Sequence, residues 1–132
     1  MRNCLPMQIR QLVSKMPRGE LVYRRGEIWW VDLDPARGVE TKKTRPCLIL
    51  QNDLGNKQSS LTTVAPFLAT KNYPFVVNIR PSPKNNLDRE RGLNLCQIRA
   101  IDSTRVLNKI GELEDFYWDE IKAALLVQLG FR

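Results

Sequence analysis

A short basic cluster is the first candidate for chemistry in this chain. Between residues 37 and 45, Glu40 is the only acid among four cations, Arg37, Lys42, Lys43 and Arg45. A guanidinium is always charged and can grip two phosphate oxygens at once. Pro46 biases Arg45 toward extended backbone, where a loop meets a strand. Arg45 is therefore a candidate for binding phosphate, although taken alone it is more typical of an ordinary surface arginine.

The amino-acid composition of the chain limits the chemistry that such a site can perform. Histidine is absent, which excludes nucleases built on histidine acid–base pairs and zinc sites built on histidine. Cys4, Cys47 and Cys96 are odd in number and contain no CxxC, so neither a disulfide framework nor a zinc site is predicted. We expect Cys47 and Cys96 to be buried thiols of a cytosolic protein. No metal ion and no cofactor is expected.

The net charge of +7 is unevenly distributed. Residues 1–25 hold six bases and one acid, whereas residues 26–132 hold fifteen bases and thirteen acids. We predict a basic N-terminal extension over 1–24, with little defined structure or as a short amphipathic helix. Residues 25–132 are predicted to form one domain. With neither a signal peptide nor an apolar run of about 18 residues, we expect a cytoplasmic protein without membrane contact.

Short runs of strand-forming residues, separated by turn-forming ones, must position these side chains. Strands are predicted over residues 27–33, 46–50, 61–67, 75–79, 93–101 and 105–110. Loops are predicted over 36–44, 52–60 and 81–92, the last as a mobile connection. A helix is predicted over 112–129, because apolar residues repeat at helical spacing, acids cluster at its start and Gly130 follows. The pattern indicates a mainly β, α+β fold: a small antiparallel barrel with a packed C-terminal helix.

Several motifs occur in a fixed order from about residue 25 to the C-terminus. They are Arg25-Gly26-Glu27-Ile28-Trp29, Val31-Asp32-Leu33-Asp34-Pro35, Gly38 with Glu40, Thr44-Arg45-Pro46, Val64-Ala65-Pro66, Tyr73-Pro74-Phe75, and Gln97-Ile98-Arg99 with Ile101-Asp102. In this order and spacing the chain resembles the MazF/PemK family of toxin endoribonucleases. The resemblance implies an SH3-like barrel, and a homodimer whose interface forms a groove for single-stranded RNA. It also implies sequence-specific cleavage, mostly of mRNA, and a cognate acidic MazE-like antitoxin that covers the groove.

RNA can be cut without a metal ion when the 2′-hydroxyl attacks the neighbouring phosphate. The 5′-oxygen then leaves, and the products carry a 2′,3′-cyclic phosphate and a 5′-hydroxyl. Under the resemblance, Arg45 would stabilise the phosphate or act as the acid. Glu40 matches an acidic family position and would act as general base or orient Arg45, unless it is simply a solvated loop carboxylate.

Two positions depart from the family pattern. The catalytic threonine that follows Val-Ala-Pro in the family falls on Leu68 here, whereas a two-residue insertion would bring Thr70 to the same strand face. Cys96 replaces an often acidic residue, and a buried cysteine is more typical there than a nucleophile. A catalytically weakened RNA-binding relative is therefore one alternative. Another is a gyrase-inhibiting toxin like CcdB, whose resemblance lies in the barrel and not in Thr44-Arg45-Pro46.

RNA contact requires side chains that stack on unpaired bases or bind their edges and phosphates. The candidates are Trp29 or Trp30, Lys42, Lys43, Asn52, Lys57, Gln97 and Arg99. Strand alternation puts Trp29 and Trp30 on opposite faces, so that one of them belongs to the core. Asn52 would equally serve as a loop cap. Gln97 and Arg99 are expected on one strand face, where a structural hydrogen bond is the alternative role.

Overall fold

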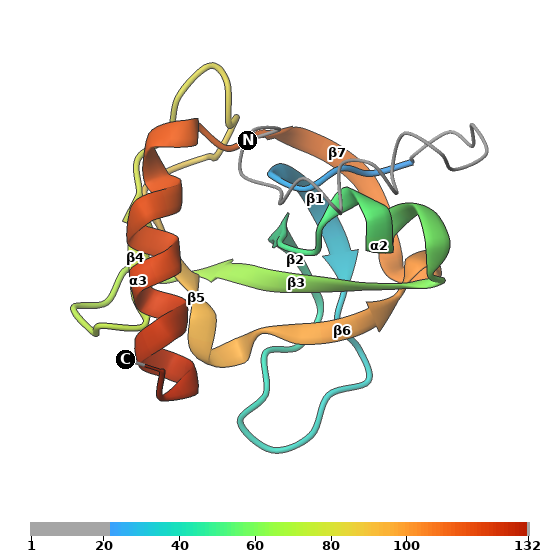
Figure 1. Cartoon of the computed structure of the whole chain (residues 1–132), viewed down its shortest axis with the longest axis horizontal. Coiled ribbons are helices and arrows are strands. Elements are labelled where there is room, and N and C mark those ends of the chain that lie inside the picture. Colours follow the sequence, from blue (N-terminus) through green and yellow to red (C-terminus); the bar gives the residue numbers. More distant parts are fainter. Residues whose placement is uncertain (1–21, 132) are drawn as a thin grey trace.

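The computed structural model describes residues 22–131 (Figure 1), so the prediction for residues 1–24 falls almost entirely outside the described part. The strands are β1 (Glu27–Asp32), β2 (Thr44–Ile49), β3 (Leu61–Leu68), β4 (Val76–Ile79), β5 (Arg91–Asn94), β6 (Arg99–Asp102) and β7 (Val106–Glu112). The helices are α2 (Asp53–Gln58) and α3 (Trp118–Leu129), with the 3₁₀ turns η2 (Leu95–Gln97), η3 (Ser103–Arg105) and η4 (Asp115–Tyr117). No helix in the described range could span a bilayer.

The strands form one antiparallel sheet that coils around itself (Figure 1). Its hydrogen-bonded order is β4-β5-β3-β2-β1-β7, and β6 pairs with β3. The path ends at β4 and at β7, so the sheet is barrel-like without being closed. Helix α3 packs beside β4 and η2. The predicted mainly β fold with a packed C-terminal helix is confirmed.

The segment predicted as one strand over 93–101 is instead two strands with a turn between them. β5 pairs with the end of β3 (Phe67↔Leu93), and β6 pairs with its start (Val64↔Arg99). The pairing of β3 with β5 is out of register with its pairing with β6, and the extra residues between β5 and β6 lie in η2. Pro66 lies at this gap and has no N–H to donate, which is a physical reason for the interruption. The prediction of a continuous strand was therefore wrong.

Two apolar clusters lie on the two faces of the sheet. Leu48 of β2 and Phe67 of β3 belong to the larger cluster, which also receives Ile121 of α3. Cys47 and Ile49, which alternate with Leu48 along β2, belong to the smaller cluster. This alternation is the period-two signature of a strand buried on both faces. It confirms the prediction of a fully buried strand after Arg45.

The helices differ from the predictions at two places and agree at a third. β7 continues to Glu112, whose N–H donates to the Lys84 carbonyl, so α3 begins only at Trp118 and the predicted start at 112 was wrong. The predicted loop 52–60 contains α2, whose N-cap is Asn52. Gly130, in the left-handed region with φ 77°, ends α3 as expected.

The connection 81–90 is fixed by hydrogen bonds, contrary to the expectation of a mobile loop. Asn85 is completely buried, and its side chain bonds to the Ser82 N–H at 2.9 Å, the Arg80 carbonyl at 2.8 Å and Glu114 Oε1 at 3.0 Å. The neighbouring Asn86 donates from Nδ2 to the Ile110 carbonyl at 2.9 Å. The amide side chains of Asn85 and Asn86 make the hydrogen bonds that strand partners would otherwise make for this segment. The polar composition of the segment was therefore not a sign of mobility.

Candidate functional site

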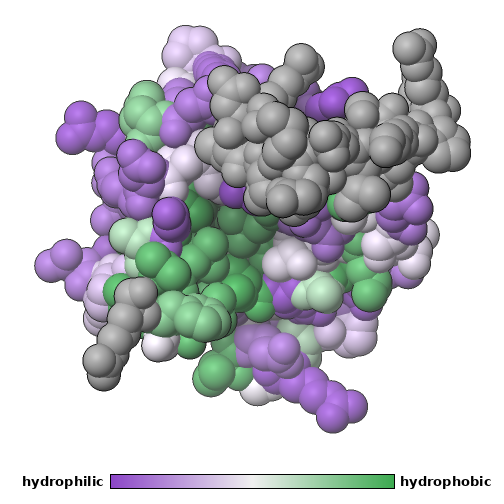
Figure 2. All heavy atoms as spheres, viewed as in Figure 1, coloured by the Kyte–Doolittle hydropathy of each residue, from purple (hydrophilic) through white to green (hydrophobic). Residues whose placement is uncertain are grey.

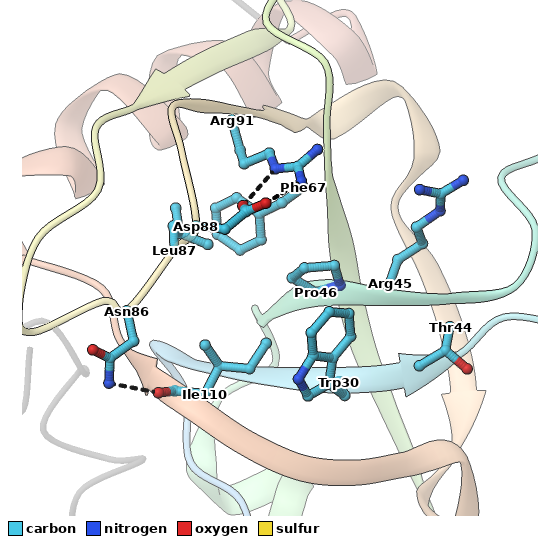
Figure 3. Close-up of a pocket in the computed structure, with 10 residues that line it drawn as sticks. All are labelled: Trp30, Thr44, Arg45, Pro46, Phe67, Asn86, Leu87, Asp88, Arg91 and Ile110. Atoms are coloured by element: carbon cyan, nitrogen blue, oxygen red, sulfur yellow. Dashed lines mark hydrogen bonds and ion pairs between the residues drawn. The ribbon is translucent and has the colours of Figure 1, made fainter.

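Arg45 stands near the start of β2, and no acid among the described residues pairs with its guanidinium. Its backbone is paired across from Val31 of β1, which fixes the base of the side chain. Nε donates to the Lys42 carbonyl at 3.3 Å, and within residues 22–131 no ion pair involves this arginine. In Figure 3 the guanidinium lies at the end of an extended side chain that leaves β2. A rigid base and an unpaired charge are what an anion-binding group requires.

The loop between β1 and β2 carries the remaining cations and is anchored at both ends. The Leu33 N–H donates to the Lys43 carbonyl at 2.9 Å, and the Lys43 N–H donates to Asp34 Oδ1 at 2.9 Å. Lys43 adopts a φ of 69°, which is unusual for a residue with a side chain. Lys42 and Lys43 are both exposed beside Arg45. Two cations of the predicted cluster, Lys42 and Lys43, are therefore accessible to solvent next to Arg45 in the chain.

The same loop is tied to the β5–β6 segment by Gln97 and Arg99. Gln97 Oε1 accepts from the Thr41 N–H at 2.7 Å and also from the Thr41 hydroxyl, and Arg99 Nη1 donates to the Leu33 carbonyl at 3.3 Å. Gln97 lies in η2 and Arg99 in β6, so the expectation of one shared strand face was wrong. Both nevertheless line a single pocket, here called the Gln97 pocket.

The Gln97 pocket has a volume of about 330 Å³ and also contains Glu40, Cys96 and Pro66 in its lining. Cys96 is exposed, which corrects the expectation that this thiol is buried. Glu40 Oε1 accepts from the Arg37 N–H at 2.7 Å, and none of the described hydrogen bonds or ion pairs joins it to Arg45. Glu40 therefore shapes the loop and faces the Gln97 pocket.

Leu68 and Thr70 differ in their relation to Arg45. β3 pairs with β2 through Cys47↔Pro66, and continuing this register by two residues puts Leu68 opposite Arg45 on the same face. The pairing of β2 with β3 has no register shift from Ile49↔Val64 to Cys47↔Pro66. Thr70 lies two residues beyond the end of the strand and is exposed. The ungapped match to Leu68 thus agrees with the observed register.

The two tryptophans lie on opposite faces, as alternation predicted. Trp29 packs against the smaller core cluster, its ring edge-on to Tyr23 at 6.5 Å, and Nε1 donates to Glu27 Oε1 at 3.1 Å. Trp30 is 42% exposed and lines a second pocket together with Arg45. Of the two aromatic candidates, Trp30 is therefore the one that the structure brings to Arg45.

Asn52 and Lys57 are not brought to this site. Asn52 Oδ1 accepts from the Gly55 N–H at 2.8 Å and so acts as the cap of α2, and Lys57 lies in the last turn of that helix. Both follow the C-terminal end of β2, whereas Arg45 is near its N-terminal end. At about 3.3 Å per strand residue, the separation along β2 alone is more than 10 Å.

The second pocket contains two residues that sequence reasoning missed, Asp88 and Arg91. The pocket measures about 360 Å³ and is bounded by Trp30, Arg45 and Pro46 on one side and by the Asp88–Arg91 pair on the other (Figure 3). We call it the Trp30 pocket. The i,i+3 spacing of an acid and an arginine in 81–92 was the available signal, but it is also common on ordinary surfaces.

Fold and site together define a class: a small barrel-like β protein with an arginine fork that has no described acidic partner and that lines a pocket beside a basic loop. The chain belongs to the PemK-like, MazF-like family of toxins of type II toxin–antitoxin systems, whose profile matches residues 24–129. The match covers nearly all of the described residues and includes the whole of the site above.

Relatives and solved structures agree with this assignment. Endoribonuclease EndoA of Bacillus subtilis is 34% identical over 83% of this chain and 97% of its own length. Endoribonuclease MazF of Staphylococcus saprophyticus is 37% identical over 81% of this chain and 91% of its own length. The crystal structure of MazF from Deinococcus radiodurans superimposes with a TM-score of 0.71 at 24% identity, covering 85% of this chain and all of that one. At that identity the structural likeness supports the fold alone.

Proposed function

We propose that this toxin is an endoribonuclease that cleaves single-stranded RNA, chiefly mRNA, at specific sequences and without a metal ion. The observation that carries the proposal is the Arg45 fork, which is fixed by β2, unpaired by any described acid and flanked by exposed Lys42 and Lys43. Two of the relatives with more than 30% identity are named endoribonucleases. The Trp30 pocket, which Arg45 lines, offers room for a nucleotide next to a phosphate bound there, and the Gln97 pocket adjoins the same β1–β2 loop through Glu40 and Thr41.

The proposed reaction is an in-line transesterification. The 2′-oxygen forms a bond to phosphorus, the bond from phosphorus to the 5′-oxygen breaks, and the products are a 2′,3′-cyclic phosphate and a 5′-hydroxyl. Negative charge builds on the two non-bridging oxygens, where the Arg45 guanidinium can donate two hydrogen bonds. The 2′-hydroxyl proton passes to a base and the 5′-oxygen receives a proton from an acid.

Glu40 and Thr70 are the proposed partners of Arg45. Glu40 lines the Gln97 pocket and would accept the 2′-hydroxyl proton, while Arg45 would supply the proton to the leaving oxygen. Thr70 would donate its exposed hydroxyl to a phosphate oxygen. Because Leu68 occupies the position opposite Arg45, a catalytically weakened RNA-binding protein is the second candidate function.

Two assembly partners complete the proposal. We infer that an acidic antitoxin neutralises the basic β1–β2 loop, since toxins of this family work with antitoxins and a MazE–MazF complex from Deinococcus radiodurans has the same fold, with a TM-score of 0.66. We also infer a homodimer. Val127, Leu129 and Phe131 at the end of α3 are more than half exposed. Figure 2 shows apolar surface continuing from this end of α3 toward the middle of the face, and such patches mark interaction surfaces.

The decisive test incubates a long defined RNA with the protein in EDTA and maps the new ends. We expect 2′,3′-cyclic phosphate and 5′-hydroxyl ends at recurring short motifs. Arg45→Ala should lower the cleavage rate by about 100- to 1,000-fold, the usual cost of removing one donor to a developing oxyanion. Arg80→Ala is the matched control, because Arg80 is 87% exposed and has only a 3.8 Å contact with Glu90.

Other outcomes separate the alternatives. Cleavage that requires a divalent cation would contradict the mechanism. RNA binding without turnover, with turnover appearing in Leu68→Thr, would establish the weakened relative. Inhibition of DNA gyrase with no RNA cleavage would favour the CcdB-like alternative.

A further inference from the structure

We propose that the Trp30 pocket holds an unpaired guanine of the RNA, stacked on Trp30 and read by the Asp88–Arg91 pair. The inference rests on the proposed function, because it assigns a base to one side of the phosphate held by Arg45. It names a specificity site that the catalytic residues alone do not provide. Three features support it: the floor of the pocket, its wall and the chemistry of the base edge.

The floor is a row of rings that crosses three strands. Trp30 of β1 lies directly opposite Pro46 of β2, and Phe67 of β3 completes the row as a buried member of the core. In Figure 3 the indole stands next to the proline ring, below the open space of the pocket. Trp30 is 42% exposed and lines the pocket, so part of its ring is available for contact. Unpaired bases stack on such aromatic surfaces.

A β-bulge keeps Trp30 in this position. β1 and β7 pair at Trp29↔Lys109 and at Val31↔Val106, and the register shifts between them. Trp30 therefore faces two residues of β7 instead of one. Bulges of this kind redirect a side chain and are frequent next to functional sites. The exposure of a large indole on a strand is thus a property of the backbone pairing and not of a loose side chain.

The wall is a paired acid and base with defined geometry. Arg91 Nε donates to Asp88 Oδ1 at 3.0 Å, and Arg91 Nη2 donates to Asp88 Oδ2 at 2.7 Å. The hydrogen bond from Arg91 lowers the pKa of the Asp88 carboxyl, so the carboxylate is charged at neutral pH. The Arg91 side chain is only 17% exposed, whereas that of Asp88 is 64% exposed. No hydrogen bond in the described part of the chain uses Arg91 Nη1.

The wall is preformed because its backbone is fixed on both sides. Leu87 is buried, and its N–H donates to Asn85 Oδ1 at 3.0 Å. Asn86 is bonded to the Ile110 carbonyl, which holds the segment against β7. Asp88 and Arg91 are therefore held in place relative to Trp30 before RNA binds. The segment that carries them does not have to fold when the RNA arrives.

The edge of guanine matches this wall. Its Watson–Crick edge has one acceptor, O6, next to two donors, N1–H and N2–H. A free guanidinium hydrogen can donate to O6, and an Asp88 oxygen that stays bonded to Arg91 has a second lone pair that can accept from N1–H and N2–H together. Adenine, cytosine and uracil lack two adjacent donors, so they would make one hydrogen bond fewer to Asp88. The larger purine ring also gives more stacking area on Trp30 than a pyrimidine would.

The test maps cleavage motifs on a randomised RNA library by sequencing the new ends. We expect guanine at one fixed motif position for the natural protein, and loss of that preference in Asp88→Asn. Trp30→Ala should reduce cleavage about 5- to 100-fold, as expected for the loss of one stacked base, and Trp30→Phe should restore most of it. Phe116→Ala is the matched control, since Phe116 is 71% exposed and does not line this pocket.

A binding measurement keeps this inference separate from the proposed function. Short 2′-O-methyl RNA oligonucleotides, which cannot be cleaved, should quench tryptophan fluorescence when they contain guanine, and the quenching should disappear in Trp30→Phe. Such quenching without any cleavage would support the pocket while the proposed function fails. Motif preferences unchanged in both Asp88→Asn and Trp30→Ala would overturn the pocket and leave the proposed function intact. Protection of Trp30 by an acidic antitoxin peptide but by no oligonucleotide would also overturn it, because the pocket would then be a protein site.

Discussion

At the scale of single residues, the arginines near the site have the same charge but different tasks. Arg99 and Arg105 donate to main-chain carbonyls of Leu33 and Asp32, and so brace the β1–β2 loop. Arg25 lies over the Trp118 ring, 4.6 Å from its centroid. Within residues 22–131, Arg45 makes one side-chain hydrogen bond, from Nε, and none from its terminal nitrogens, which our proposal assigns to a phosphate. All of these residues are arginines, so residue type cannot distinguish them. Their tertiary contacts decide which guanidinium is available to bind a ligand.

The two described cysteines provide a prediction at this scale. Burial raises the pKa of the Cys47 thiol to about 12, with a smaller opposing effect from Arg99, whereas Cys96 is exposed. In a Cys4→Ser background, iodoacetamide should label Cys96 in the folded protein and Cys47 only after unfolding. Peptide mapping by mass spectrometry checks this. Equal labelling of both thiols in the native state would contradict the described burial.

The same thiol predicts a pH dependence of stability. The unfolded thiol ionises near its ordinary value of 9.0, and the folded one near 12. Between these values the folded state binds the extra proton, so the free energy of unfolding should fall as pH rises, by up to about 1.4 kcal/mol per pH unit. Cys47→Ala should remove this part of the slope in urea unfolding between pH 9 and pH 11. A slope that does not change on this substitution would argue against a buried thiol.

At the scale of elements, the close approach of the 84–88 segment to β7 sets the wall of the Trp30 pocket. Gly111 of β7 lies beneath this segment, and a Cβ at that position would come within 2.5 Å of the Asn85 carbonyl oxygen and 2.6 Å of the Lys84 carbonyl oxygen. Backbone atoms on both sides leave no flexible neighbour to yield. A glycine that looks unremarkable in the sequence is therefore required by packing between two segments.

Gly111→Ala tests this close approach. We expect it to lower the free energy of unfolding by about 3 kcal/mol, the upper part of the usual range for overpacking, and to weaken the guanine preference by displacing Asp88. Urea unfolding and motif mapping measure the two effects. Gly38→Ala is the control: its Cβ meets nothing within 4 Å, so only its positive φ of 57° should cost about 1 kcal/mol. Equal losses in the two variants would rule out the close approach as the cause.

At the scale of the whole molecule, two surfaces with different chemistry are arranged around the sheet. The basic β1–β2 loop is a polar surface that suits RNA or an acidic antitoxin, and the end of α3 is an apolar surface that suits a second copy. Sedimentation should give twice the monomer mass at micromolar concentration. Because the RNA groove is inferred to span two subunits, dimerisation and cleavage should be lost together.

Leu129→Glu tests that link. A charge placed on an apolar interface is costly to bury, so we expect monomers with an unchanged far-UV circular dichroism spectrum and greatly reduced cleavage. Phe116→Glu, at the other end of the helix region, should leave both properties intact. A natural protein that is monomeric yet fully active would refute the dimeric groove.

The sequence by itself determined the elements with strong local patterns. Strand runs around Trp29, Leu48 and Val64 were predicted to within two residues at each end, and the glycine that ends α3 was identified, because burial pattern and turn chemistry are local properties. The order of short motifs gave the family. The basic cluster around Arg45 was also visible, since its members are neighbours in the chain.

Only the tertiary structure decided which distant residues meet at the site. The interruption of the predicted strand 93–101, the fixed connection 81–90 and the bulge at Trp30 all depend on partners far away in the chain. The exposure of Trp30 and the placing of Asp88 and Arg91 across from it follow from those pairings. Sequence patterns report what each segment prefers, whereas pockets arise from which segments the sheet brings side by side.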